Sequence, residues 1–117
     1  MLEMSSMEDW QACLAVSSQN PVLVFKHSTQ CPISAGARKG LIEYLAHGGP
    51  TILPAYEVLV IESRPVSNAI AESLGVAHKS PQLFLVHKGK AVWSASHYGI
   101  NRDAIADAVK QLITKEE

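Results

Sequence analysis

The fold is decided by residues 22–34, which read VLVFKHSTQCPIS. Residues 22–25 form a continuous apolar run rich in valine, which is typical of a central strand covered on both faces. A polar loop, residues 26–30, follows that strand. Pro32 suits the first turn of a helix, where its missing N–H group is not needed. We therefore predict a strand, a loop and a helix, with Cys31 at the N-terminus of the helix.

Cys31 and Ser34 define the chemistry that this stretch predicts. Free backbone N–H groups at a helix N-terminus favour the thiolate form of a cysteine, and the thiolate is the form that attacks disulfides. A two-cysteine redox motif would carry its second sulfur three residues further on, where this sequence has Ser34. No disulfide can therefore close within the motif, and a mixed disulfide on Cys31 must be resolved by an outside thiol.

The sequence leaves two roles open for Ser34. Its spacing from Cys31 allows the hydroxyl to donate a hydrogen bond to the thiolate, which would make the thiolate a better leaving group. Alternatively, Ser34 is an ordinary polar residue of the first helical turn. In both cases Cys31 is the expected nucleophile, and Ser34 is the residue expected beside it.

Composition restricts the class of protein. The chain has 117 residues, which predicts one domain, residues 1–117, with a core that needs no disulfides or metals. A net charge of −1 gives no reason to expect a nucleic-acid partner. Residues 1–9 have neither a basic start nor a sustained apolar run, and no later stretch approaches the length of a membrane span. We therefore expect a cytoplasmic protein without a membrane partner, and the sequence predicts no oligomeric state.

Cys13 differs from Cys31 in its surroundings. It lies with Leu14 on the apolar face of a helix predicted over residues 7–18, so core packing is the favoured role and a redox role the alternative. The dissimilar contexts of the two cysteines argue against a structural disulfide. The five histidines do not form a pair four residues apart on one predicted helix, so we expect no metal site.

The remaining elements follow from turn, cap and period signals. The hairpin is indicated by two apolar strands around a short glycine-bearing turn. Three further helices and their ends are indicated by caps and breakers. The expected elements are a capping box of Ser5 and Glu8, an end of the second helix at 48–50, strands 56–61, 82–87 and 91–95, a helix from Pro65 to Gly75, and a last helix capped by Asn101.

The order of these elements is α, β, α, β, α, β, β, α. It predicts an α/β fold in which a four-stranded mixed sheet has helices on both faces. With a cysteine after the first long strand and Ser80–Pro81 just before the hairpin, the chain resembles thioredoxin-like proteins. In those proteins the proline follows a cis peptide bond, and the backbone before it faces the cysteine and pairs with the substrate. The resemblance thus implies that Ser80 and Pro81 bind substrate.

Two shorter motifs narrow the resemblance. The sequence CPIS follows a strand end that reads VFKHS, and Ser96-His97-Tyr98 follows the hairpin. Together they are similar to the monothiol bacilliredoxin family. This similarity implies an enzyme that removes bacillithiol, a small cysteine-containing sugar thiol, from cysteines of other proteins. Cys31 would then attack the mixed disulfide. The implied partners are bacillithiolated proteins and a small thiol, with bacillithiol as co-substrate and no cofactor.

Basic residues near the motif suggest how such a substrate is attracted. Bacillithiol contains a malate unit with carboxylates, and we expect a basic rim to attract it, with Lys26 and Lys79 as substrate-binding residues. His27, just before the motif, is a possible cation beside Cys31. The other members expected in the rim are Arg38, Lys39 and His78.

Two other functions stay open at the level of the sequence. The first is a redox-inactive thioredoxin-like adaptor, in which the groove before Pro81 binds an extended peptide through its backbone. The second is a monothiol exchanger that uses a different small thiol. Retention of Cys31 speaks against the adaptor, whereas the identity of the small thiol rests on the family resemblance alone.

Overall fold

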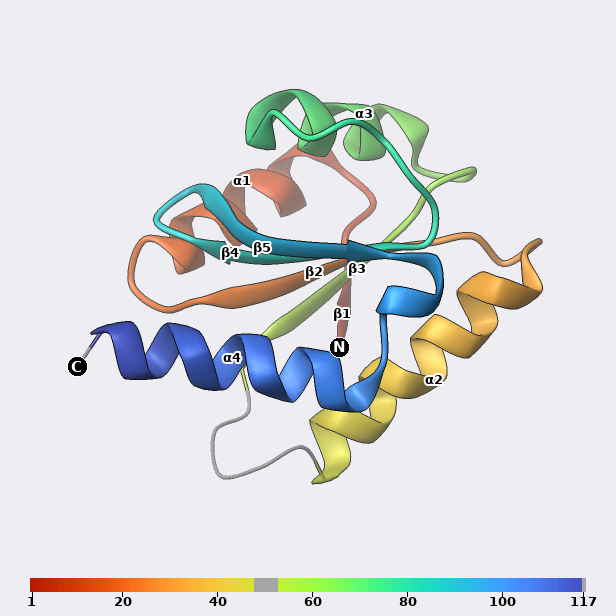
Figure 1. Ribbon diagram of the computed structural model, residues 1–117. Coiled ribbons are helices and arrows are strands. Elements are labelled where there is room, and N and C mark those ends of the chain that lie inside the picture. The colour runs from red at the N-terminus through yellow and green to blue at the C-terminus, as the bar shows by residue number, and fades with distance from the viewer. Residues whose placement is uncertain (48–52, 117) are drawn as a thin grey trace.

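A computed structural model describes residues 1–47 and 53–116 and shows a sheet between two layers of helices (Figure 1). The elements confirm the predicted order, with two additions: a short strand near the N-terminus and a 3₁₀ turn after the last strand. They are β1 (Leu2–Glu3), α1 (Met7–Ser17), β2 (Val22–His27), α2 (Pro32–His47), β3 (Ala55–Leu59), α3 (Arg64–Leu74), β4 (Gln82–His87), β5 (Lys90–Ser96), the 3₁₀ turn η1 (His97–Gly99) and α4 (Arg102–Glu116).

The sheet is mixed and has the strand order β1-β3-β2-β4-β5. β2 is central: it runs parallel to β3 and antiparallel to β4, and β4 and β5 form the expected hairpin. The prediction of four strands is one short, because β1 adds a fifth strand beside β3. Leu2 and Glu3 are both exposed and too few to show a strand period, so only their pairing with β3 defines this strand.

The two faces of the sheet have separate apolar cores. Side chains alternate along a strand, so Leu23 and Phe25 of β2 face the α2 and α4 layer, whereas Val22 and Val24 face the α1 and α3 layer. Figure 1 shows these two layers on opposite sides of the sheet. Burying each large apolar side chain contributes roughly 1.5–3 kcal/mol, so β2 is fixed from both faces.

Lys26 and His27 lie in β2 and not in the polar loop predicted for residues 26–30. Both are buried, with 0% and 7% of their surfaces exposed. They continue the strand because β3 and β4 pair with it as far as His27 and Lys26, respectively. The apolar run that predicted the strand ends at Phe25, so the polar side chains of Lys26 and His27 gave no indication that the strand continues.

The helix ends combine confirmed and corrected predictions. The capping box of α1 is formed by Ser6 and Asp9, one residue after the predicted pair of Ser5 and Glu8. The sequence offers both registers because serines and acidic residues each occur in adjacent pairs. Gly75 ends α3 in the left-handed conformation, as predicted. The predicted end of the second helix at residues 48–50 lies outside the described residues.

The start of α4 packs closely against α2. The Asn101 side chain accepts a hydrogen bond from the Ala104 N–H at 2.9 Å, which confirms the predicted cap. A Cβ atom added to Gly40 would lie 3.1 Å from the Cα of Asn101, a distance that side chains do not tolerate without movement. Gly40 therefore allows the two helices to approach, whereas Gly36 faces open space.

Candidate active site

Cys31 lies at the boundary between the loop after β2 and the first turn of α2. Its carbonyl accepts a hydrogen bond from the Ala35 N–H at 3.1 Å, and its own N–H donates to the Ser28 carbonyl at 3.3 Å. The first bond makes Cys31 the N-terminal cap of α2, as the position of Pro32 predicted. The thiol is free and partly exposed, so a disulfide substrate can reach it.

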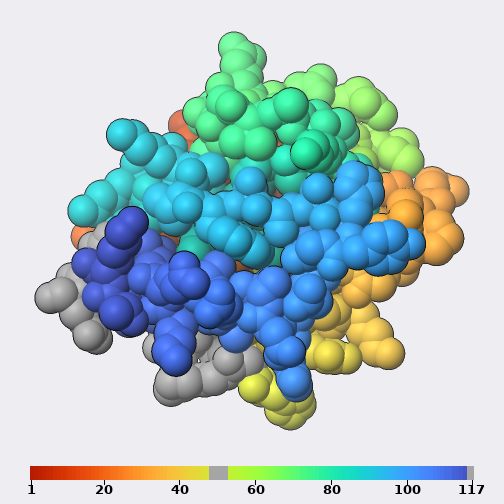
Figure 2. Space-filling model, in the orientation of Figure 1, coloured from red at the N-terminus to blue at the C-terminus, as the bar shows by residue number. Residues whose placement is uncertain are grey.

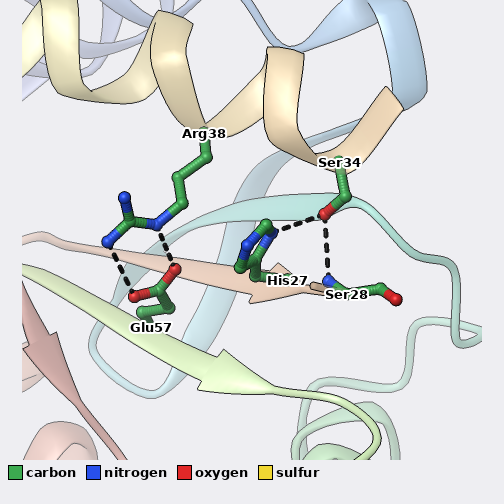
Figure 3. A network of polar contacts seen from close by, with 5 residues as sticks. All are labelled: His27, Ser28, Ser34, Arg38 and Glu57. Carbon is green, nitrogen blue, oxygen red and sulfur yellow. Dashed lines mark hydrogen bonds and ion pairs between the residues drawn. The ribbon is translucent and has the colours of Figure 1, made fainter. Parts of the chain in front are cut away.

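Ser34 is fully buried beneath the first turn of α2. Figure 3 shows its hydroxyl between two groups at the end of β2: it accepts a hydrogen bond from the Ser28 N–H at 3.0 Å and lies 2.7 Å from Nδ1 of His27. When Nδ1 is the acceptor, the one hydroxyl proton is directed to His27 and not to Cys31. Ser34 thus ties the loop before Cys31 to the helix that follows it.

His27 is held as a neutral ring in this network. Burial, the largest effect, lowers its pKa below the usual 6.5; the charge of Glu57 opposes this shift, Arg38 adds to it, and Glu62 opposes it more weakly. The lowered pKa disfavours the cationic form that the sequence left possible for His27. Its ring stacks on Phe25 with centroids 5.5 Å apart, which fixes the orientation of the nitrogen that meets Ser34.

An ion pair lies beside this network under α2. Arg38 donates to the two carboxylate oxygens of Glu57 in β3 at 2.7 and 3.3 Å (Figure 3). Glu57 is only 6% exposed, so its charge needs this partner. The pair raises the pKa of the Arg38 guanidinium, first through the hydrogen bond to Glu57. Arg38 thus neutralises an internal carboxylate, and its charge is not available as part of a surface rim.

The structure divides the other basic residues between surface and interior. Lys26 is fully buried, and its ammonium lies 3.1 Å from Nδ1 of His78, so the prediction that it belongs to an exposed rim is wrong. Its stem lies on the same face as Val24, because alternate residues of a strand share a face. Lys39, His78 and Lys79 are exposed, as a rim would require.

Ser80 and Pro81 lead directly into β4. The peptide bond between them is cis, and the Pro81 carbonyl accepts a hydrogen bond from the His97 N–H at 3.2 Å. The hydroxyl of Ser80 is buried and has no hydrogen-bond partner among residues 1–47 and 53–116. The segment before β4 is thereby attached to η1 at the end of β5.

An open groove of about 400 Å³ runs beside Cys31, between the start of α2 and η1. Figure 2 shows the two segments against each other on the molecular surface. Tyr98 on the groove is 81% exposed. The groove is lined by Pro32, Ile33, Gly36, Ala37, His97, Tyr98, Ile100 and Asn101. Sequence reasoning noted the motif at 96–98 but could not place it beside α2.

Cys13 lies on the other side of the sheet from α2. It is completely buried in the core under α1 and α3, together with Trp10 and Val58. Burial raises the pKa of its thiol to about 12. Its predicted role as a core residue is confirmed, and the thiol is held in the unreactive protonated form.

Groups of metal-binding side chains and membrane-spanning helices are both absent from the described part of the chain. Among the side chains of residues 1–47 and 53–115, no three from His, Cys, Asp or Glu form a group suited to a metal ion. In the same residues, no helix has the length and apolar character needed to cross a membrane.

The fold and the cysteine at the start of α2 define a thioredoxin-like redox protein. The chain is similar to a solved structure described as a candidate oxidoreductase with a thioredoxin fold, with 31% identity over 92% of each chain and a TM-score of 0.82. It is also similar in fold to thioredoxin from Trypanosoma brucei brucei, with 11% identity, 97% and 91% coverage and a TM-score of 0.74. Residues 2–105 match the monothiol bacilliredoxin BrxC family, and the chain belongs to this family.

Proposed function

We propose that this protein is a monothiol thiol–disulfide oxidoreductase that removes bacillithiol from mixed disulfides on other proteins. The observation that carries the proposal is the pair of positions 31 and 34: an accessible thiol at the start of α2 and a buried hydroxyl where a second sulfur would lie. Cys13 is buried on the opposite face of the sheet and does not replace that sulfur. The bacilliredoxin family supports bacillithiol as the small thiol.

The proposed reaction has two exchange steps. In the first, the Cys31 thiolate attacks the bacillithiol sulfur of the mixed disulfide, the bond between the two substrate sulfurs breaks, and the target protein leaves as a thiolate that takes a proton from water. Cys31 then carries bacillithiol in a new disulfide. In the second step an external thiolate attacks the bacillithiol sulfur, forms a disulfide with it and releases the Cys31 thiolate.

Other residues are proposed to bind and orient the substrate. Ser34 fixes the loop that carries Cys31, through its bonds to His27 and Ser28. Ser80 and Pro81 would receive the backbone of the target protein, as the thioredoxin-like fold suggests. Lys79 is exposed on the segment before them and would attract the carboxylates of bacillithiol. The two free thiols fit a reducing cytoplasm, which we propose as the location.

The direct test is a reduction assay with one target protein prepared as two mixed disulfides, one with bacillithiol and one with glutathione. We expect release of bacillithiol in the presence of an external thiol, with a bacillithiol adduct on Cys31 in the mass spectrum when that thiol is omitted. The Cys31→Ser variant is the control. Faster turnover of the glutathione disulfide would favour a different small thiol, whereas absence of both activities and of any adduct would favour the adaptor.

A further inference from the structure

Lys26 and Gln82 form a buried polar pair at one end of the sheet. They lie directly opposite each other in the β2–β4 ladder, and they are 0% and 2% exposed. Val24 and Phe84, two residues away on the same face, belong to the apolar core under α1 and α3. The Lys26 ammonium lies 6.0 Å from the centre of the Phe84 ring. Two long polar side chains therefore occupy positions where the core would accept apolar ones.

The polar ends of both side chains hold one short segment, residues 77–79. The Gln82 amide donates to the Ala77 carbonyl at 3.2 Å, and its oxygen accepts from the Lys79 N–H at 3.2 Å. Between these residues, His78 meets the Lys26 ammonium at 3.1 Å. Three consecutive residues without regular secondary structure are thus each attached to the sheet by a side chain.

This segment leads to the groove beside Cys31 through a short path. It continues into Ser80 and Pro81, and the Pro81 carbonyl is bonded to the N–H of His97. His97 lines the groove together with Pro32, the residue next to Cys31. The position of residues 77–79 therefore affects one wall of the groove without contact to the reactive thiol.

The ammonium of Lys26 has an unusual partner. Among the side chains of residues 1–47 and 53–115 no carboxylate pairs with it, and its hydrogen bond goes to a histidine ring. Burial lowers the pKa of Lys26 to about 8. The pKa of His78 is lowered by burial and then by the charges of Lys26 and Arg64, so the ring is neutral at neutral pH and Nδ1 accepts the bond. Ser67 of α3 also lies 3.5 Å from that nitrogen.

We propose that Lys26 and Gln82 are positioning residues that hold residues 77–79, and with them Ser80–Pro81, in the geometry that binds a protein mixed disulfide. The inference rests on the proposed function for its readout, because it concerns the binding of that substrate. Lys26 and Gln82 together form a clamp on residues 77–79, and this clamp acts separately from the thiol chemistry. Its loss weakens substrate binding and leaves the intrinsic reactivity of Cys31 unchanged.

The hydrogen bond between Lys26 and His78 weakens at both low and high pH. Below the pKa of His78, the ring gains a proton, Nδ1 no longer accepts a bond, and the two cations repel each other. Above about pH 8, Lys26 loses the charge that strengthens the bond. Substrate binding through this clamp is therefore tightest between these two values. The charged or titratable groups that face the ring are Lys26 and Arg64, with Ser67 as a neutral neighbour.

The test uses the full chain with Lys26→Met and His78→Ala, and with Lys90→Met as matched control at the exposed far end of the hairpin. We expect KM for a bacillithiolated protein to rise about tenfold in Lys26→Met, the effect of losing one hydrogen bond to a charged group. His78→Ala should give a similar rise and remove the acidic limb of the KM profile. The double variant should add little to either change, because both remove the same contact.

Alkylation of Cys31 by iodoacetamide separates positioning from reactivity. We expect rates within about twofold of the unmodified protein in all these variants, because the clamp does not contact the thiol. An unchanged KM and pH profile in both single variants would overturn the proposal, as would alkylation rates that fall in step with KM. If Lys26→Met does not fold, the outcome is decided by two other variants. His78→Ala changes an exposed residue, and the conservative Lys26→Arg variant is expected to bind substrate as the unmodified protein does.

Hydrogen exchange distinguishes failure of this inference from failure of the proposed function. The Lys79 amide donates to Gln82, so Gln82→Met should speed its exchange about tenfold while amides in the middle of β2 stay protected. Unchanged exchange would overturn the clamp whatever the substrate is. Faster exchange with no turnover of any mixed disulfide by the unmodified protein would overturn the proposed function while retaining the clamp.

Discussion

The two cysteines of this chain have the same side chain in opposite environments. Cys13 is packed in the core under α1 and α3, where burial raises the pKa of its thiol to about 12. Cys31 caps α2 and is partly exposed beside an open groove. Because the sheet lies between these sites, neither sulfur can assist the other without unfolding. Position in the fold, and not residue type, decides which thiol reacts.

The largest expected effect is loss of activity in Cys31→Ser. A serine hydroxyl cannot form a disulfide, so release of bacillithiol from a mixed disulfide should fall to the uncatalysed rate. Cys13→Ala should keep the rate within about twofold and lose roughly 1–2 kcal/mol of stability through the cavity it leaves. Loss of activity in the Cys13 variant, at a temperature where it is folded, would show that the comparison between the two thiols is wrong.

Thiol labelling compares the two cysteines by the rates at which they react with iodoacetamide. In the native protein at pH 8, one thiol should react with iodoacetamide, and peptide mass spectrometry should place the label on Cys31. Cys13 should react at least ~1000-fold more slowly, because labelling requires an opening close to global unfolding. Equal labelling of both residues without denaturant would contradict the buried position of Cys13.

The raised pKa of Cys13 also predicts a dependence of stability on pH. Below about pH 9 the thiol is protonated in both the folded and the unfolded states, and its contribution to stability is fully present. Between about 9 and about 12 the unfolded state loses the proton first, so stability falls with rising pH by up to about 1.4 kcal/mol per pH unit. Urea unfolding from pH 8 to 10 should show a smaller decline for Cys13→Ala.

Ser34→Cys tests the comparison by giving Cys31 a neighbouring sulfur. On oxidation, this variant should form a disulfide between residues 31 and 34, which is detected as loss of both labels, whereas the unmodified protein should need an outside thiol. The change should also cost about 1–3 kcal/mol, because the Ser28 N–H and His27 lose a hydroxyl partner. Ser34→Ala is the control for that cost, since it removes the same hydroxyl without adding a sulfur.

The smallest expected effect concerns surface charge. Lys79 is exposed on the segment before Pro81, so Lys79→Glu should lower kcat/KM for a bacillithiolated protein about two- to threefold, and 0.5 M salt should reduce the difference. Labelling of Cys13 should not change. A salt-independent effect would contradict the role of the Lys79 charge in attracting the substrate.

Local signals were sufficient for the element that carries Cys31. The apolar run at 22–25 and Pro32 predicted a strand and a helix because their preferences depend on neighbours in the chain. The capping box shifted by one residue because two overlapping pairs satisfy the same local rule. Such predictions need little knowledge of the rest of the molecule.

The polar interior was beyond local reasoning. The burial of Lys26 depends on pairing with β4, and its partner His78 is 52 residues away in the chain. The position of Ser34 was predicted, but its hydrogen bonds depend on a histidine whose burial the sequence did not reveal. Gln82 gave no signal at all, because a single glutamine at the start of a strand is usually a solvated residue.

The close contact at Gly40 has a consequence for how the protein is made. The Cys31 helix is seated against the start of α4, which follows all the strands in the chain, and the sheet is complete only after β5 has emerged. On the ribosome, both sulfurs are therefore part of the nascent chain before the complete sheet lies between them. The distinction between a reactive and a buried thiol therefore arises only once the sheet has formed around Cys13.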